Sequence, residues 1–134
     1  MTIRRIDSGG RWEQQYGYSR AVAVGPWVLT SGSTSTVNGV VAHVGDPYAQ
    51  AREAFRIALD SLVELGAGVA DVVRTRMYVT APEYSEAVGK AHGDLFGVVR
   101  PVATLVVVSR LLHPDHLVEV EVEAYREPRE EERA

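Results

Sequence analysis

The sequence predicts an α+β fold in which two helices cover one face of a β-sheet. Segments with helical spacing of apolar residues occur twice, and strand-like segments lie before, between and after them. The segment Val102–Leu111 is apolar at both sets of alternating positions, which is typical of a strand covered on both faces. Two helices cover only one face. The sequence therefore predicts a partner subunit on the other face, with small-ligand sites at the interface.

Composition places the chain among ordinary globular proteins. It has 134 residues, enough for one domain with a core, and its net charge of −4 disfavours a nucleic-acid binder dominated by phosphate contacts. It has no cysteine, which excludes disulfides and thiolate chemistry. No segment has the apolar length of a signal peptide or a membrane span, so we expect a cytoplasmic protein without a membrane partner. We expect one domain over residues 1–126, and a disordered charged tail over 127–134 because that tail lacks an apolar anchor.

The first part of the chain reads as short strands and loops. Gly9-Gly10 opens a loop rich in aromatic and amide residues, Gly25-Pro26 marks a hairpin turn, and the hydroxyl-rich segment Ser31–Thr36 reads as another loop. The predicted strands are residues 2–7 at the sheet edge, 20–24, 27–31 and 40–44.

Two helices are predicted from capping residues and apolar stripes. Asp46 is an N-cap candidate and Pro47 suits the first helical turn, while Gly66 suits the position after the last turn. A second helix follows Pro82. The two stripes are Ala51, Ala54, Phe55, Ala58, Leu62 and Leu65 in the first helix, and Tyr84, Val88, Ala91 and Leu95 in the second. Gly89 and Gly93 each weaken the second helix by about 1 kcal/mol. We expect them to allow close packing on the sheet, the alternative being close approach of a ligand or partner.

The remaining strands carry the charged side chains of interest. Over 72–80, alternation predicts Val73, Met77 and Val79 on one face and Arg74, Arg76 and Tyr78 on the other. The strand at 117–125 alternates valines with Glu119, Glu121 and Glu123, whose Cα atoms lie roughly 6.6–6.8 Å apart in succession. This carboxylate row is either solvated, paired with the two arginines, or functional.

Taken together, these segments resemble the YjgF/RidA family over residues 16–126. The resemblance rests on the order and spacing of several short motifs: Gly17–Val22, Val28–Gly32, the helix at 46–66, Asp71–Thr75, Phe96-Gly97, Arg100-Pro101 and Val118–Glu121. It implies a chorismate-mutase-like α+β fold, and a homotrimer with a central barrel and three clefts between subunits. It also implies cofactor-free and metal-free hydrolysis of reactive enamines and imines, such as 2-aminoacrylate, to keto acids and ammonia.

The resemblance also indicates site residues. Tyr18 matches the ligand-positioning tyrosine, Ser31-Gly32 matches the loop that faces the ligand, and Glu121 matches the glutamate that activates water. A partly buried carboxylate among like charges would have a raised pKa and could act as a base near neutral pH. For Glu121 this role is as well supported as simple pairing, whereas for Glu119 and Glu123 we expect solvation or pairing. Tyr18 either orients a ligand or packs at an interface.

The main departure from the family pattern lies after Pro101. The arginine that grips the substrate carboxylate in deaminating members is replaced by Ala103, and the neighbouring cysteine is replaced by Leu105. Alanine supplies neither the charge nor the bidentate geometry of arginine. Arg100 lies at an odd offset from position 103, so on a continuous strand it faces the other way. It also precedes a proline, and if the chain is still turning there Arg100 could replace the missing arginine, which is the less favoured alternative. Altered substrate preference is therefore expected, and activity on 2-aminoacrylate-type carboxylates is not.

Histidines give weaker signals. His92 in the second helix is more typical of a packed residue than of a ligand-binding one, and His113–His116 reads as a turn rather than a metal site. The catalytic candidates are thus Glu121 and Tyr18, and the substrate-binding candidates are Ser31, Gly32, Ala103, Leu105, Arg100 and His92. Two functions follow: an imine or enamine hydrolase, or a non-catalytic trimeric module that binds a small metabolite. An endoribonuclease label carried by some relatives finds little support in the acidic charge balance.

Overall fold

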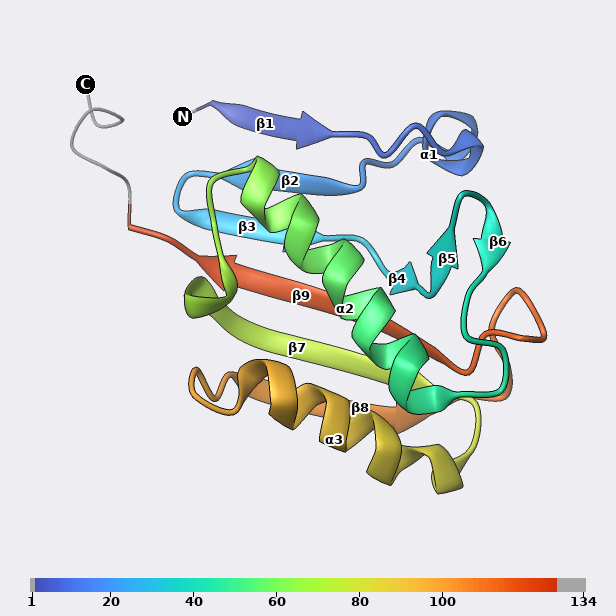
Figure 1. Ribbon diagram of the computed structural model, residues 1–134. Helices are drawn as coiled ribbons and strands as arrows, with labels where there is room; N and C mark the ends of the chain where they lie inside the picture. The colour runs from blue at the N-terminus through green and yellow to red at the C-terminus, as the bar shows by residue number, and fades with distance from the viewer. Residues whose placement is uncertain (1, 128–134) are drawn as a thin grey trace.

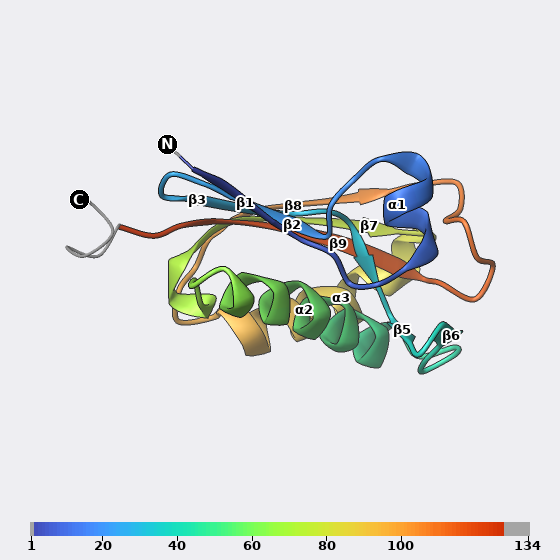
Figure 2. The same cartoon turned by 90° about the horizontal axis from the view of Figure 1, so that it is seen from above.

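The computed structural model describes residues 2–127 and shows a sheet with two long helices on one face (Figure 1, Figure 2). The sheet contains β1 (Ile3–Ile6), β2 (Ala21–Val24), β3 (Trp27–Thr30), β4 (Ser33–Thr34), β7 (Val72–Val79), β8 (Val102–Val107) and β9 (Val118–Tyr125), and β5 (Thr36–Val37) pairs with β6 (Val40–Val41) beside it. The helices are α1 (Arg11–Tyr16), α2 (Pro47–Glu64) and α3 (Ser85–Phe96), with short 3₁₀ turns η1 (Val69–Asp71) and η2 (Pro82–Tyr84). The predicted α+β fold is confirmed.

Strand β9 lies at the centre of this sheet. The strand order is β1-β2-β3-β9-β7-β8, and β4 also pairs with β9. Strand β9 is antiparallel to β3, β4 and β7, whereas β8 runs parallel to β7 because α3 provides the crossover. The predicted hairpin between β2 and β3 is confirmed, and so is the edge position of β1.

Helix α2 begins and ends where the sequence predicts. The Asp46 side chain accepts a hydrogen bond from the Ala49 amide at 3.0 Å, and Pro47 occupies the first turn. Gly66 follows the last turn with φ = 86°, a left-handed conformation that favours glycine.

The core lies between this helical layer and the sheet. Phe55 of α2 and Phe96 of α3 meet edge to face, with ring centroids 5.1 Å apart, and both are fully buried. Alternate residues of β9 complete the same layer: Val118, Val120, Val122 and Ala124. Burying a large apolar side chain contributes about 1.5–3 kcal/mol, so this face makes a large contribution to the stability of the fold.

Four sequence expectations are wrong in detail. The predicted loop after Gly9-Gly10 contains α1, and the hydroxyl-rich loop contains β4, which hydrogen-bonds to β9. The strand predicted at 102–111 ends at Val107. Val73 does not share the face of Met77, because a β-bulge between Val72 and Arg74 shifts the alternation.

Gly89 and Gly93 do not pack closely within the chain. A Cβ atom added at either glycine would meet no atom within 4 Å. The expectation that they permit close contact with the sheet is therefore wrong. Of the predicted stripe, Val88 and Ala91 are buried and Tyr84 and Leu95 are partly buried against the core, and Phe96, which the stripe did not include, is buried as well.

The face opposite α2 and α3 is open in this chain (Figure 2). Strand β8 forms one edge of the sheet, and on the open face its Val102 and Val106, which pair with Arg74 and Tyr78, are 58% and 41% exposed. Isolated exposed valines are common, but these two on one face of an edge strand, with Thr104 between them, form a small apolar strip. None of the helices within residues 2–127 is long and apolar enough to cross a membrane.

Candidate functional site

The carboxylate row of β9 lies on the open face of the sheet. Pairing places Glu119 between Thr34 of β4 and Tyr78 of β7, and Glu121 opposite Arg76. Glu123 lies between Leu29 of β3 and Arg74. The alternate residues of β9 are buried under α2, so the three glutamates all face away from the helices.

Glu121 and Glu123 are held by side chains of β7. The Tyr78 hydroxyl group donates a hydrogen bond to Glu121 Oε1, and this bond is the main reason that the pKa of Tyr78 is raised. Arg76 donates to Glu123 at 2.7 Å and lies 4.0 Å from Glu121. Arg74 lies 3.9 Å from Glu123. The expected pairing with the two arginines is confirmed for Glu123, whereas the tyrosine contact of Glu121 was not predicted.

Glu119 has a different environment from the rest of the row. Its carboxyl group packs directly on Gly32, so closely that a Cβ atom at that position would overlap it. Burial raises the pKa of Glu119, the nearby charge of Glu121 raises it further, and the charge of Arg20 opposes both. We expected Glu119 to be solvated or paired with Arg74 or Arg76. This expectation is wrong, because its carboxyl group is partly buried against Gly32 instead.

Hydrogen bonds fix the Ser31-Gly32 segment against the start of β2. The Ser31 amide donates to the Arg20 carbonyl at 3.0 Å, and the Ser31 hydroxyl group donates to the Ser19 carbonyl at 2.6 Å. Arg20 Nη2 donates to the Gly32 carbonyl at 2.7 Å. Both predicted residues of the segment are therefore held rigidly beside Glu119.

A cleft of about 340 Å³ opens next to this segment, lined by Tyr18, Ser31 and their neighbours, with Arg5 of β1 at its rim. Tyr18 follows Gly17, which ends α1 in a left-handed conformation with φ = 77°. The amides of both residues donate to the Glu13 carbonyl, which fixes the approach of Tyr18 to the cleft. The Tyr18 side chain is 42% exposed and can contact a ligand or a neighbouring subunit.

The structure does not bring the remaining candidates to this cleft. Ala103 and Leu105 pair with Thr75 and Met77, which are buried on the helix side, so they face the helix side of the edge strand. Arg100 is exposed in a turn before β8 and has φ = 55°. The chain is thus still turning at Arg100, which is the alternative to a continuous strand, so the odd offset does not fix the direction of its side chain. A site that combines these residues with Tyr18 needs a second subunit.

His92 is a structural residue. Its Nε2 atom lies 2.7 Å from the Thr75 hydroxyl group, and its ring packs against Phe55 and Phe96. Burial lowers the pKa of His92, so the neutral form is favoured. The structure therefore gives it a packing role and not a place in the cleft. His116 likewise contacts Thr36 at 3.0 Å in the loop before β9.

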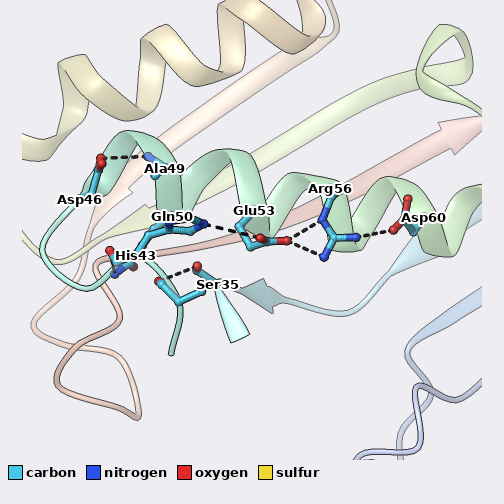
Figure 3. Close-up of polar contacts among 9 residues, drawn as sticks. Ser35, His43, Asp46, Ala49, Gln50, Glu53, Arg56 and Asp60 are labelled. Carbon is cyan, nitrogen blue, oxygen red and sulfur yellow. Dashed lines mark hydrogen bonds and ion pairs between the residues drawn. The ribbon is translucent and has the colours of Figure 1, made fainter. Parts of the chain in front are cut away.

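Gln50 is a positioning residue that the sequence analysis missed. It is fully buried in α2, close to His43 (Figure 3). Its Nε2 atom donates to the carbonyl groups of His43 and Asp115 at 3.2 and 2.9 Å. Its Oε1 atom accepts from the Leu117 amide at 2.9 Å. These bonds fix the chain just before β9 and so the position of Glu119. A signal was available, since Gln50 precedes Ala54 and Ala58 at four-residue spacing.

Comparison with known proteins agrees with this architecture. The family model described as "Endoribonuclease L-PSP" matches residues 11–126. The crystal structure of Rv2704 from Mycobacterium tuberculosis, described as a member of the YjgF/YER057c/UK114 family, superposes with a TM-score of 0.84 at 41% identity, over 92% of this chain and 99% of that one. This chain belongs to the YjgF/RidA family.

Other relatives extend the comparison. A Streptomyces coelicolor protein is 44% identical over 124 residues, which cover 92% of each chain. A RutC family protein of Pyrococcus abyssi is 30% identical over 82% of this chain and 87% of its own. The crystal structure of the Escherichia coli YjgF gene product superposes with a TM-score of 0.74 at 26% identity, over 81% of this chain and 87% of that one. The family fold is thus shared across distant organisms.

Proposed function

We propose that this YjgF/RidA family member is a cofactor-free hydrolase of small imines or enamines. The observation that carries the proposal is the partly buried carboxyl group of Glu119 against Gly32, next to Ser31, which lines the cleft together with Tyr18. A raised pKa makes this carboxylate a stronger base than an ordinary glutamate, which favours activation of water.

The reaction needs one carboxylate and an oriented substrate. Glu119 accepts a proton from water as the oxygen attacks the imine carbon, and the C=N π electrons move to nitrogen, which takes this proton back from the Glu119 carboxyl group. In the resulting carbinolamine, Glu119 transfers the hydroxyl proton to the amino nitrogen, the C–N bond breaks with its electrons leaving on ammonia, and the O–H electron pair forms the carbonyl group. Tyr18 and the Ser31-Gly32 segment hold the substrate in this scheme.

Glu121 remains the second carboxylate candidate. Its hydrogen bond from Tyr78 and its proximity to Arg76 occupy the carboxylate, which favours Glu119 as the base and gives Glu121 a supporting role. The two residues lie on the same face of β9 and can be tested side by side.

The substrate cleft is proposed to be completed in a homotrimer. The apolar strip on β8 supports this proposal, because a neighbouring subunit would cover it. The sheet order supports it as well: Tyr18 lies just before β2, and β2 and β8 are on opposite sides of β9, so residues of β8 reach Tyr18 only from another subunit. Val106→Asp places a charge in this strip, so we expect it to convert the trimer to monomers in sedimentation or light scattering. A Val63→Asp control on exposed α2 should leave the assembly unchanged.

The alternative is a trimeric module that binds a small metabolite without chemistry. Ala103 favours it, because the cation that grips a substrate carboxylate in deaminating relatives is missing. Ligand-dependent thermal stabilisation without turnover is the result expected of such a module.

One assay separates these functions. An amino-acid oxidase generates imines in situ from a panel of amino acids, and keto-acid release is followed with and without the protein. We expect acceleration by the wild type, a loss of about 10²–10³-fold in Glu119→Gln, as for removal of a general base, and a smaller loss in Glu121→Gln. If the wild type accelerates keto-acid release no more than Glu119→Gln and Glu121→Gln do, the proposed hydrolase is excluded.

A companion variant addresses substrate preference. Ala103→Arg restores the cation of deaminating relatives, so we expect a gain in activity on carboxylated imines. No gain would mean that the cleft differs from those relatives in more than this one side chain.

A further inference from the structure

Arg20 contacts the candidate site without lining its cleft. Its Nη2 atom donates to the Gly32 carbonyl at 2.7 Å, and its own carbonyl accepts from the Ser31 amide at 3.0 Å. One residue therefore holds both ends of the Ser31-Gly32 segment. Because this segment is joined to β2 mainly through Arg20 and Ser19, loss of the guanidinium group would free the Gly32 carbonyl to rotate.

Glu119 packs on the same glycine. Its carboxyl group leaves no room for a side chain at Gly32, so the carboxylate and the Arg20 guanidinium group both contact this one residue. The opposite charges attract each other, yet no ion pair within 4 Å joins them among the described residues. The charge of Arg20 thus partly offsets the burial of the Glu119 carboxylate, whose pKa is still raised overall.

The Arg20 side chain also carries a cost. Its Nε atom is buried and has no hydrogen-bond partner within the described part of the chain. An unsatisfied buried donor costs about 1–3 kcal/mol, and such groups are often found where function and not stability fixes the side chain.

We propose that Arg20 is a positioning residue of the site: it fixes the Gly32 carbonyl and places a positive charge opposite Glu119, and so holds the ligand-facing segment and the carboxylate in one arrangement. This proposal rests on the proposed hydrolase. Arg20 acts through Gly32 and Glu119 and does not touch the substrate itself.

Two variants separate the two parts of this role. Arg20→Gln removes the charge and the planar fork, so we expect kcat/KM for the imine panel to fall about 10²-fold, as for a misplaced catalytic group. The acidic limb of the pH–rate profile should also move to higher pH, because Arg20 lowers the pKa of Glu119. Arg20→Lys keeps the charge, so the limb should stay near its wild-type position although kcat/KM still falls.

A second measurement does not depend on turnover. The carboxyl carbon of Glu119 is followed by NMR during a pH titration of ¹³C-glutamate-labelled protein, with Glu119→Gln identifying the resonance. We expect its midpoint to rise in Arg20→Gln and to stay near the wild-type value in Arg20→Lys. Arg56→Gln is the matched control, because Arg56 pairs with Glu53 and Asp60 on the exposed side of α2 and should leave the midpoint unchanged.

The outcomes distinguish the two proposals. An inactive wild type overturns the hydrolase, while a moved Glu119 midpoint would still support the electrostatic part of the Arg20 role. An active protein in which Arg20→Gln changes neither the midpoint nor the pH–rate profile overturns the role of Arg20. Circular dichroism and thermal melting confirm that each variant is folded before either comparison.

Discussion

The two faces of β9 show how one strand serves both stability and chemistry. On the helix side, Val118, Val120, Val122 and Ala124 are buried beneath α2 and contribute apolar area to the core. On the open side, Glu119, Glu121 and Glu123 hold charges in contact with β7 and the Ser31-Gly32 segment. Residues next to each other in sequence thus have opposite roles, because consecutive side chains point to opposite faces.

Because the two faces differ in this way, substitutions on one face should affect a different property of the protein from substitutions on the other. Changes on the helix side should alter the free energy of unfolding with no change in proton chemistry. Changes on the open side should alter proton chemistry with small or even favourable effects on stability. The stability of the covered face is what allows an unfavourable desolvated carboxylate to persist on the other.

The largest effect is expected for Phe55→Ala. Phe55 is fully buried and packs against Phe96 and His92, so its truncation leaves a cavity in the helix-side core. We expect a loss of about 3–5 kcal/mol in the free energy of unfolding, measured by urea denaturation. Val63→Ala is the control, since Val63 lies on the exposed side of the same helix and should change stability by less than about 0.5 kcal/mol. Equal losses in both variants would contradict the assignment of the core.

A smaller loss is expected for Gln50→Leu. The leucine preserves most of the volume but leaves two carbonyl groups and the Leu117 amide without their partner. We expect a loss of about 2–4 kcal/mol, together with faster hydrogen exchange of the Leu117 amide. Gln14→Leu at an exposed position provides the comparison. Unchanged exchange at Leu117 would show that the start of β9 does not depend on Gln50.

Glu119→Gln should stabilise the protein near neutral pH. The folded-state pKa of Glu119 lies above its unfolded value, so the ionised form is disfavoured by folding. Stability of the wild type should rise as pH falls through the folded-state pKa, and the advantage of the glutamine variant should vanish below about pH 4, where both states are protonated. Thermal melting across this range measures the difference. A variant less stable than the wild type at pH 7 would contradict the desolvation of Glu119.

The sequence predicted the helix side of this comparison better than the open side. Apolar spacing and the Asp46-Pro47 cap located α2, because those patterns depend on neighbours within one helix. The alternation of β9 likewise separated the valines from the glutamates. These features are local, so a single sequence contains them.

The environment of each glutamate could not be predicted in this way. Glu119 contacts Gly32 and is influenced by Arg20, which lie roughly 90 to 100 positions earlier in the chain, whereas Glu121 is held by Tyr78 and Arg76 of β7. The bulge at Val73 and the hydrogen bonds of Gln50 also depend on pairing between distant segments. The family resemblance predicted Ser31-Gly32 and Tyr18 as site residues. The register of β4 with β9 then determines that Glu119 is the carboxylate beside Gly32.

The smallest effect on stability is expected for Glu121→Gln, which tests the middle of the open face. The hydrogen bond between Tyr78 and Glu121 is partly buried, so its loss should cost about 1 kcal/mol. The clearer signal is the pKa of Tyr78, which the bond raises and which should move back toward 10 in the variant. Ultraviolet titration of tyrosine ionisation measures it, with Tyr78→Phe identifying the contribution of this residue among six tyrosines. If the Tyr78 titration is the same with glutamine at 121, the carboxylate does not hold this hydroxyl group in solution, and Glu121 becomes as available for catalysis as Glu119.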